Sequence, residues 1–311
     1  MFTCRICGNN TNNKLYQGKE TRMGFRDEFI YIKCSECGCL QIEKYPSNIA
    51  EYYAGYYSLQ QQKTKESLWR IFARNQLFKY RMTGQNFLGK IIAGVIPDSF
   101  YWIVPNMFGF NSSIIDIGCG SGRLILKMAN SGFHNISGID SFLNDDIVYN
   151  TKNKQITIKK QDIYKLQGHY DFLMLHHVLE HLPNQHRVFE KLASLMHKNS
   201  KLLINIPIID SYTWDNYEMN AFQLSDIPRH YYLHSNNSIS ILAEKYNLKI
   251  DQRQYYGNGN ILIESEKLKL DKVLCNNFNF TKKEINYFQR TAKQLLKNRQ
   301  TGLCCFYLSL K

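Results

Sequence analysis

The chain has 311 residues, 44% of them hydrophobic, which is enough to bury one large core and a small additional module. No run of about 18 uninterrupted apolar residues occurs, which argues against a transmembrane helix, and the first residues lack the apolar core of a signal peptide. We therefore expect a cytoplasmic protein whose nine cysteines are reduced. The net charge of +13 permits an anionic partner but does not require one.

Residues 1–45 hold two cysteine pairs, Cys4 with Cys7 and Cys34 with Cys37, each with C-x-x-C spacing. Each pair can place two thiolates on one ion, and the two pairs together complete a tetrahedral site. We therefore predict a small N-terminal zinc-ribbon module that binds Zn²⁺. Four thiolates leave no open coordination position, so the expected ion is structural. A disulfide framework, the alternative, is disfavoured in a reducing compartment.

The rest of the chain predicts two further regions. Residues 46–110 are rich in aromatic side chains near helical spacing, which indicates a helical connector. Residues 111–311 alternate β-like runs with helical stretches, which predicts an α/β domain with a mostly parallel sheet flanked by helices. The expected strands are Ser113–Ile117, Ile136–Asp140, Ile156–Lys159, Phe172–Leu175, Lys201–Ile206, Leu248–Gln254, Ile261–Glu264 and Leu303–Leu310.

Besides a helix that begins near Leu124, three further helices are expected in the last region: Gln185–His197, residues 239–247, and a helix opened by the capping box of Thr281 and Glu284. The apolar face of that third helix is expected to consist of Ile285, Phe288, Ala292, Leu295 and Leu296.

The first strand of the α/β region ends in three glycines at alternate positions: Gly118, Gly120 and Gly122. Glycine is needed where a backbone turns sharply and approaches a ligand closely. A dinucleotide fingerprint would require a further glycine where Arg123 stands, so a dehydrogenase is disfavoured. Asp140 ends the next strand, where a carboxylate can accept hydrogen bonds from both ribose hydroxyls. Asp162 follows the third strand and could accept an adenine amino group; either aspartate could instead cap a helix.

Four parts of the sequence resemble, in their order along the chain, the motifs of class I S-adenosylmethionine-dependent methyltransferases: Asp116–Gly122, Asp140, Asp162 and Tyr170–Pro183. The resemblance spans roughly residues 110–265 and implies a Rossmann-like sheet. It also implies that the protein is an enzyme that uses S-adenosylmethionine.

By this resemblance the cofactor-binding residues follow the motifs along the chain. The three glycines would admit the methionine part of the cofactor, and Asp116 would face its amino group. Asp140 would hold the ribose, while Asp162 and Ile163 would hold the adenine. His176 would border the transfer site.

The layout also resembles a narrower group of methyltransferases that carry an N-terminal zinc-binding domain and act on sugars, either nucleotide-linked or in surface polysaccharides. A tyrosine-rich segment, Glu51–Tyr57, follows the cysteine pairs. The stretch Trp214–His234 follows the fifth strand, where such enzymes place substrate-facing residues. The expected substrate-binding residues are Trp214, Arg229 and Tyr231.

An acceptor hydroxyl or carbon acid must lose a proton during methyl transfer, and histidine titrates near neutrality. His230 is the first candidate for this general base and His177 the second, although His230 could equally be a packed, hydrogen-bonded residue. Arg229 would bind a phosphate or carboxylate, and Tyr231 would orient a sugar. Several histidines between residues 176 and 186 suggest a metal, but the glutamate of an H-E-x-x-H motif is missing, so a catalytic metal is disfavoured.

Other functions remain open from the sequence. Some ribosomal RNA guanine methyltransferases carry an N-terminal zinc module, and the basic residues of 267–299 favour such an RNA substrate mildly. Against it, the sequence lacks the motifs of adenine-amino and cytosine-C5 methyltransferases. A non-enzymatic docking module is disfavoured by the complete set of cofactor motifs. Peripheral membrane contact through residues 66–110 is a third alternative, less favoured than helix packing.

Overall fold

The structure is a computed structural model that describes residues 2–53, 66–95, 100–151, 155–272 and 278–311. The chain forms two compact units. Unit 1 consists of Met1–Ala54, His177–Phe189 and Asn205–Phe306, and unit 2 consists of Gly55–His176, Glu190–Ile204 and Tyr307–Lys311. The three-domain division with boundaries after residues 45 and 110 stays a prediction. Within the described ranges, no helix is both long and apolar enough to cross a bilayer.

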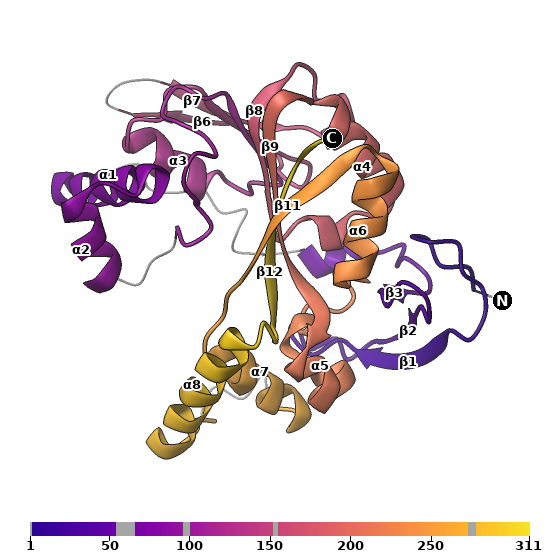
Figure 1. Cartoon of the computed structure of the whole chain (residues 1–311). Coiled ribbons are helices and arrows are strands. Elements are labelled where there is room, and N and C mark those ends of the chain that lie inside the picture. Colours follow the sequence, from indigo (N-terminus) through magenta and orange to yellow (C-terminus); the bar gives the residue numbers. More distant parts are fainter. Residues whose placement is uncertain (1, 54–65, 96–99, 152–154, 273–277) are drawn as a thin grey trace. The chain divides into compact units, whose positions relative to one another are not determined.

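Unit 2 contains a mostly parallel sheet. Its strands are β4 (Ile114–Ile117), β5 (Ile136–Asp140), β6 (Ile147–Asn150), β7 (Gln155–Lys160), β8 (Tyr170–His176) and the first part of β9 (Met196–Ser211). Their order is β9-β8-β4-β5-β7-β6. Figure 1 shows the edge strand β6 beside β7. The pairs β4–β5, β4–β8 and β5–β7 are parallel, whereas the edge strand β6 is antiparallel to β7. All four residues of β4 are buried, as expected for a strand in a parallel sheet.

The helices associated with unit 2 are α1 (Leu68–Thr83), α2 (Phe87–Val95), α3 (Arg123–Asn130), the end of α4 (Gln185–Ser194) and the 3-10 turn η3 (Ile163–Lys165). Ser67 caps the start of α1, and Gly84 ends it in a left-handed conformation with φ of 73°. The expected helical character of this region is confirmed over α1 and α2. Along α1, Phe78 is buried, whereas Leu68 and Phe72 are exposed.

Unit 1 contains a second sheet, in the order β1-β2-β3-β10. Its strands are β1 (Lys14–Lys19), β2 (Glu28–Lys33), β3 (Leu40–Ile42) and β10 (Tyr232–Leu233). Strand β10 pairs antiparallel with β3, so that Tyr232 lies opposite Gln41 and Leu233 opposite Leu40. The sheet that begins beside the N-terminal cysteines is therefore completed by a strand that is distant from it in the sequence.

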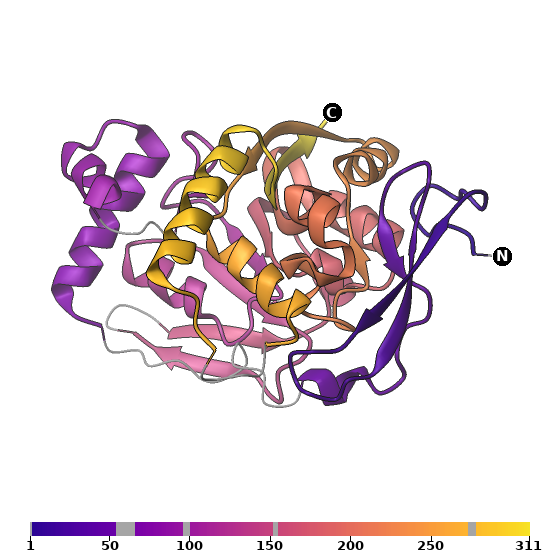
Figure 2. The ribbon, with the colours of Figure 1, turned by 90° about the horizontal axis from the view of Figure 1, so that it is seen from below.

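Unit 1 also holds β11 (Leu248–Tyr255), most of β12 (Thr301–Leu310) and the end of β9, in the order β11-β12-β9. Its helices are α5 (Tyr212–Tyr217), α6 (Asn236–Lys245), α7 (Asn260–Lys269) and α8 (Lys282–Lys297), together with the start of α4 and the 3-10 turns η1 (Ile49–Tyr53), η4 (Leu179–His181), η5 (Glu218–Asn220) and η6 (Phe222–Leu224). Helices α7 and α8, orange and yellow in Figures 1 and 2, lie side by side. A cluster of apolar side chains joins them: Ile261, Leu262, Phe288 and Leu295.

The α/β class and the mixed sheet flanked by helices are confirmed, but three expected details are wrong. The expected strand Ile261–Glu264 lies in helix α7, where Ile261, Ser265 and Leu268 are buried with helical i, i+4, i+7 spacing. A run of three apolar residues cannot distinguish a strand from a buried helical turn. The expected helix Gln185–His197 ends at Ser194, because β9 begins at Met196.

The third difference concerns the apolar face of α8. Phe288, Ala292 and Leu295 are buried as expected, whereas Ile285 is 38% and Leu296 37% exposed. Ile285 and Leu296 lie on either side of the buried residues. The buried face of α8 is therefore narrower than the apolar face predicted from the sequence.

Candidate functional site

The glycine loop between β4 and α3 has the backbone conformation that its sequence predicts. Gly118, Gly120 and Gly122 have φ of 71°, 55° and 81°, in the left-handed region that favours glycine. Gly122 also lacks space for a side chain, since a Cβ atom there would lie 2.5 Å from Cδ1 of Ile158. Both conformation and packing therefore require glycine at the start of α3.

Two buried aspartates lie beside this loop. Asp140, the last residue of β5, accepts a hydrogen bond from the backbone N–H of Gly120 at 2.8 Å and another from Phe142 at 2.9 Å. Burial raises the pKa of Asp140, and these two N–H groups oppose the rise. Asp116 in β4 is 3% exposed, and burial together with the Asp140 charge raises its pKa well above the ordinary value. Its carboxyl group thus lies in a position that favours a nearby cation.

The other predicted cofactor residues follow β7 and β8. Asp162 caps the 3-10 turn η3 by accepting a hydrogen bond from the N–H of Tyr164 at 2.8 Å, which is the capping role that the sequence left open. Ile163 is buried. His176 ends β8, and its ring lies edge-on to Trp102 with 4.8 Å between the centroids. All predicted cofactor residues thus lie in unit 2, at or just after the carboxyl ends of parallel strands, where open α/β sheets bind ligands.

A separate group of titratable residues lies in unit 1. Glu180 and His181 belong to the turn η4, and His230 comes from the loop before β10. One potential ligand atom of each lies within 4.8 Å of the others. His181 Nδ1 lies 2.9 Å from the carbonyl oxygen of Arg229, and His230 Nδ1 lies 2.6 Å from that of Gln223. Burial lowers the pKa of both histidines to about 4, so both rings are neutral at neutral pH.

His177 lies at the edge of this group, in the turn that follows β8. Its Nδ1 atom lies 3.4 Å from Oε1 of the fully buried Glu180, and its Nε2 atom lies 3.1 Å from the hydroxyl of Tyr256. That hydroxyl donates a hydrogen bond to Asn205 at 2.7 Å. His177 has φ of 55°, an uncommon value for a residue with a side chain. The surrounding contacts hold the imidazole between a carboxylate and a phenol.

The three predicted substrate-binding residues are buried in unit 1. Arg229 pairs with Asp226, with 2.8 Å between nitrogen and oxygen, and its guanidinium lies 5.5 Å from the ring centroid of Tyr53. The ring of Tyr231 lies 4.7 Å from that of Tyr45. Trp214 packs edge-on against the ring of Tyr16, at 5.2 Å. These contacts give each residue a packing role, and their assignment to substrate stays a prediction. Residues 54–57 of the tyrosine-rich segment lie outside the described residues.

Sequence reasoning missed Glu180, Asp226 and Tyr256. A signal for Glu180 was present, because it directly precedes His181 within the family motif. Asp226 precedes His230 by four residues and lies 3.8 Å from its Nε2 atom. Nothing in the sequence links Tyr256 to His177, since the contact depends on the fold.

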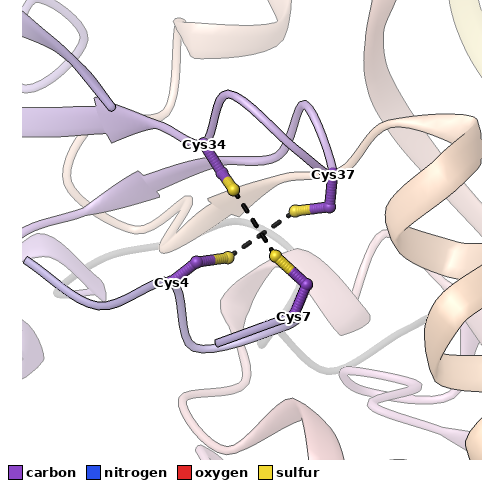
Figure 3. Close-up of side chains that lie close together, drawn as sticks. All are labelled: Cys4, Cys7, Cys34 and Cys37. Atoms are coloured by element: carbon purple, nitrogen blue, oxygen red, sulfur yellow. Dashed lines mark hydrogen bonds between the residues drawn. The ribbon is translucent and has the colours of Figure 1, made fainter. Parts of the chain in front are cut away.

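The four cysteines of the N-terminal module converge on one point (Figure 3). Sγ of Cys4 lies 3.6 Å from Sγ of Cys37, and Sγ of Cys7 lies 3.5 Å from that of Cys34. These separations are close to the edge of about 3.8 Å that a tetrahedron with Zn–S bonds of about 2.3 Å would have. The amide of Gln41 donates a hydrogen bond to Cys4 Sγ at 2.9 Å. A hydrogen bond from Cys37, opposed by burial, lowers the pKa of Cys4 to about 4, which favours a thiolate.

The sequence matches the model of a protein family described as a methyltransferase domain over residues 72–253, more than half of the chain. Solved structures with a similar fold include phospholethanolamine N-methyltransferase 2 of Haemonchus contortus, with 17% identity, a TM-score of 0.41, and coverage of 96% of this chain and 68% of that one. A SAM-dependent methyltransferase of Archaeoglobus fulgidus has 17% identity, a TM-score of 0.40, and coverage of 64% and 85%. No curated protein matches the sequence. These structural likenesses are distant, so the substrates in those names belong to those proteins.

Proposed function

Because the chain belongs to the methyltransferase domain family and is thus an S-adenosylmethionine-dependent methyltransferase, we propose that it methylates a sugar or glycan-type molecule, such as a nucleotide-linked sugar or a precursor of a surface polysaccharide. The acceptor class is supported by the resemblance of the whole layout, with cysteine pairs ahead of a methyltransferase domain, to enzymes of that kind. One observation supports the reaction. The glycine loop, whose Gly120 N–H donates a hydrogen bond to Asp140, lies at the carboxyl ends of β4 and β5.

The residues of unit 2 fit the cofactor. When bound, S-adenosylmethionine supplies an electrophilic methyl group on a sulfonium sulfur. The loop Gly118–Gly122 would let the backbone approach its methionine part, and the buried carboxyl of Asp116 would bind the ammonium group, a cation that its raised pKa favours. Each oxygen of Asp140 accepts one backbone hydrogen bond, so further lone pairs remain for the ribose hydroxyls. The methyl group moves by in-line displacement, so alignment supplies much of the rate.

We assign the proton acceptor to His177 ahead of His230. The side chain of His177 is 48% exposed and that of His230 9%, so an acceptor can reach the first ring more readily. The carboxylate of Glu180, whose Oε1 atom lies 3.4 Å from Nδ1 of His177, would stabilise the positive charge that the ring gains when it accepts the proton. A pKa of about 4 makes His230 a weak base at neutral pH.

The cysteine module fits a structural Zn²⁺. Cys4, Cys7, Cys34 and Cys37 would supply four thiolates, and the N–H donors around them, such as the Gln41 amide, would stabilise the negative charge. Such an ion has no open position, so its role would be to hold the fold of the module.

The proposed function is tested by calorimetry and methyl transfer. Gly122→Val should abolish binding of S-adenosylmethionine, because the new side chain would collide with Ile158 and strain the left-handed backbone. Gly109→Ala is the matched control, since no atom lies within 4 Å of its Cβ position. If Gly122→Val binds the cofactor as the wild type does, the loop is not the cofactor site.

The acceptor is sought by incubating the enzyme and labelled cofactor with a panel of nucleotide sugars and glycans and recording a mass shift of one methyl group. On the acceptor so found, His177→Ala should reduce kcat by roughly 10²–10⁴-fold with unchanged cofactor affinity. Near-normal turnover would remove His177 from the mechanism, and labelling of none of the panel would reject the sugar assignment.

One observation favours RNA as a second acceptor. Lys283, Arg290 and Lys297 recur every seven residues along α8 and share one exposed face, opposite the buried Phe288. Such a face suits a polyanion, and binding would weaken steeply with salt. Absence of RNA binding at low salt would reject this alternative.

A further inference from the structure

We propose that Glu180, His181 and His230 form a binding site for a divalent transition-metal cation, separate from the cysteine cluster. One carboxylate oxygen and two imidazole nitrogens, all within 4.8 Å of one another, are a donor set that can hold a divalent transition-metal cation such as Zn²⁺ or Mn²⁺. The missing glutamate of an H-E-x-x-H motif disfavours only a metal site built on a single helix. Here two donors come from a 3-10 turn and the third from a distant loop.

The state of Glu180 points independently to a cation. Its side chain is fully buried, and neither carboxylate oxygen accepts a hydrogen bond from any described residue. The nearest ionisable partner is His177, whose Nδ1 atom lies 3.4 Å from Oε1. A buried carboxylate without hydrogen bonds costs several kcal/mol unless a charge compensates it. A divalent cation between Glu180 and the two histidines would supply that charge.

The two histidines are oriented as ligands. A carbonyl oxygen only accepts hydrogen bonds, so Nδ1 of His181 must donate to Arg229 and Nδ1 of His230 must donate to Gln223. Each ring therefore carries its lone pair on Nε2, the tautomer that metal-binding histidines adopt when a backbone carbonyl holds the other nitrogen.

The two buried carboxylates near the proposed site, Asp226 and Glu180, differ in their ion-pair partners. Asp226, whose Oδ2 atom lies 3.8 Å from His230 Nε2, is already paired with Arg229 and with Arg22. Its charge is therefore compensated, whereas that of Glu180 is not. Three protein ligands would leave open positions on the ion, which is typical of catalytic or substrate-binding sites. If the proposed methyl transfer to a sugar holds, those positions would take acceptor hydroxyl oxygens.

The test uses the full chain, purified with Zn²⁺ and dialysed, and titrated with MnCl₂ while free Mn²⁺ is followed by electron paramagnetic resonance. Mn²⁺ prefers oxygen and nitrogen ligands, so the thiolate cluster should not compete. We expect one Mn²⁺ per chain, displaced by added Zn²⁺. Glu180→Gln should weaken binding at least tenfold, while Glu190→Gln, an exposed glutamate on α4, should leave it unchanged.

Thermal unfolding separates a binding defect from misfolding. Mn²⁺ should raise the Tm of the wild type and not that of Glu180→Gln. Without Mn²⁺ the variant should be at least as stable as the wild type, because it lacks the uncompensated charge. Absence of Mn²⁺ binding by the wild type, or equal binding by Glu180→Gln, would overturn the proposal. Neither measurement requires cofactor or acceptor, so the outcome is independent of the methyl-transfer test.

Discussion

His234 shows how burial fixes the charge of a single residue. It is fully buried beside β10, with Nδ1 3.1 Å from the hydroxyl of Ser238 and Nε2 3.1 Å from Oε1 of Gln185. Burial lowers its pKa from 6.5 to about 3 in the folded protein. Between these values the unfolded chain binds the proton and the folded chain does not, so the free energy of unfolding falls as the pH falls.

We therefore predict that the stability contributed by neutral His234 is complete above pH 6.5 and is lost progressively as the pH falls toward 3. One such group changes the free energy of unfolding by up to about 1.4 kcal/mol per pH unit. Urea unfolding at several pH values should show a shallower pH dependence for His234→Gln than for the wild type. His169→Gln, at an exposed histidine, is the control and should keep the wild-type slope. Parallel curves for His234→Gln and the wild type would contradict the prediction.

At the scale of elements, α1 and α2 pack through a glycine. A Cβ atom at Gly89 would lie 2.1 Å from the carbonyl oxygen of Gln76 and 2.5 Å from Cβ of Tyr80. Gly94, on the same helix, has no atom within 4 Å of its Cβ position. The two glycines thus differ in packing, but both lower the stability of the helix relative to alanine because glycine has a low helix propensity.

We predict opposite effects for the two alanine substitutions. Gly89→Ala should destabilise unit 2 by roughly 1–3 kcal/mol, because the helices must separate to admit the methyl group. Gly94→Ala should be neutral or stabilise by up to about 1 kcal/mol. Chemical denaturation of both variants measures the difference. Equal stability of the two would show that α1 and α2 do not need the close approach.

The sequence predicts best the helices and strands whose ends are marked by characteristic residues, such as turn residues or a capping box. The strand Ile136–Asp140 is observed with the expected bounds, because turn residues flank it on both sides. The capping box at Thr281 is likewise present, with Glu284 bonded back to the backbone. The strand predicted at Ile261–Glu264 was wrong because three consecutive apolar residues show no periodicity. The helix that forms there packs against α8.

On the scale of the whole molecule, the two candidate sites differ in how far sequence could predict them. The predicted cofactor residues follow successive strands of one parallel sheet, so their order along the chain already places them at one edge. The cluster of Glu180, His181 and His230 depends on a long-range pairing, since β10 joins β3. No local pattern encodes that pairing, and the carboxylate within the cluster was therefore overlooked.

The same pairing connects the cysteine module to the histidines. The hydroxyl of Tyr31 in β2 donates to the carbonyl of His230 at 2.8 Å, and the N–H of Ile42 in β3 donates to that of Tyr231 at 2.9 Å. The hydroxyl of Ser235 is hydrogen-bonded to the carbonyl of Cys37. A folded module is therefore needed to hold the His230 segment in place, whereas the cofactor residues belong to unit 2.

We predict that loss of the proposed zinc ion separates cofactor binding from turnover. Structural zinc contributes about 10–16 kcal/mol in zinc-finger peptides, more than the stability of a typical domain, so Cys34→Ser should unfold the module. The variant should contain less zinc by atomic absorption and lose methyl transfer, and calorimetry should give a cofactor Kd within about threefold of the wild type. Cys39→Ala, at a cysteine outside the cluster, should keep both the metal and the activity. Full turnover by a zinc-free Cys34→Ser variant would mean that the histidine segment folds without the module, and that the contacts through Tyr31 and Ile42 do not position His230.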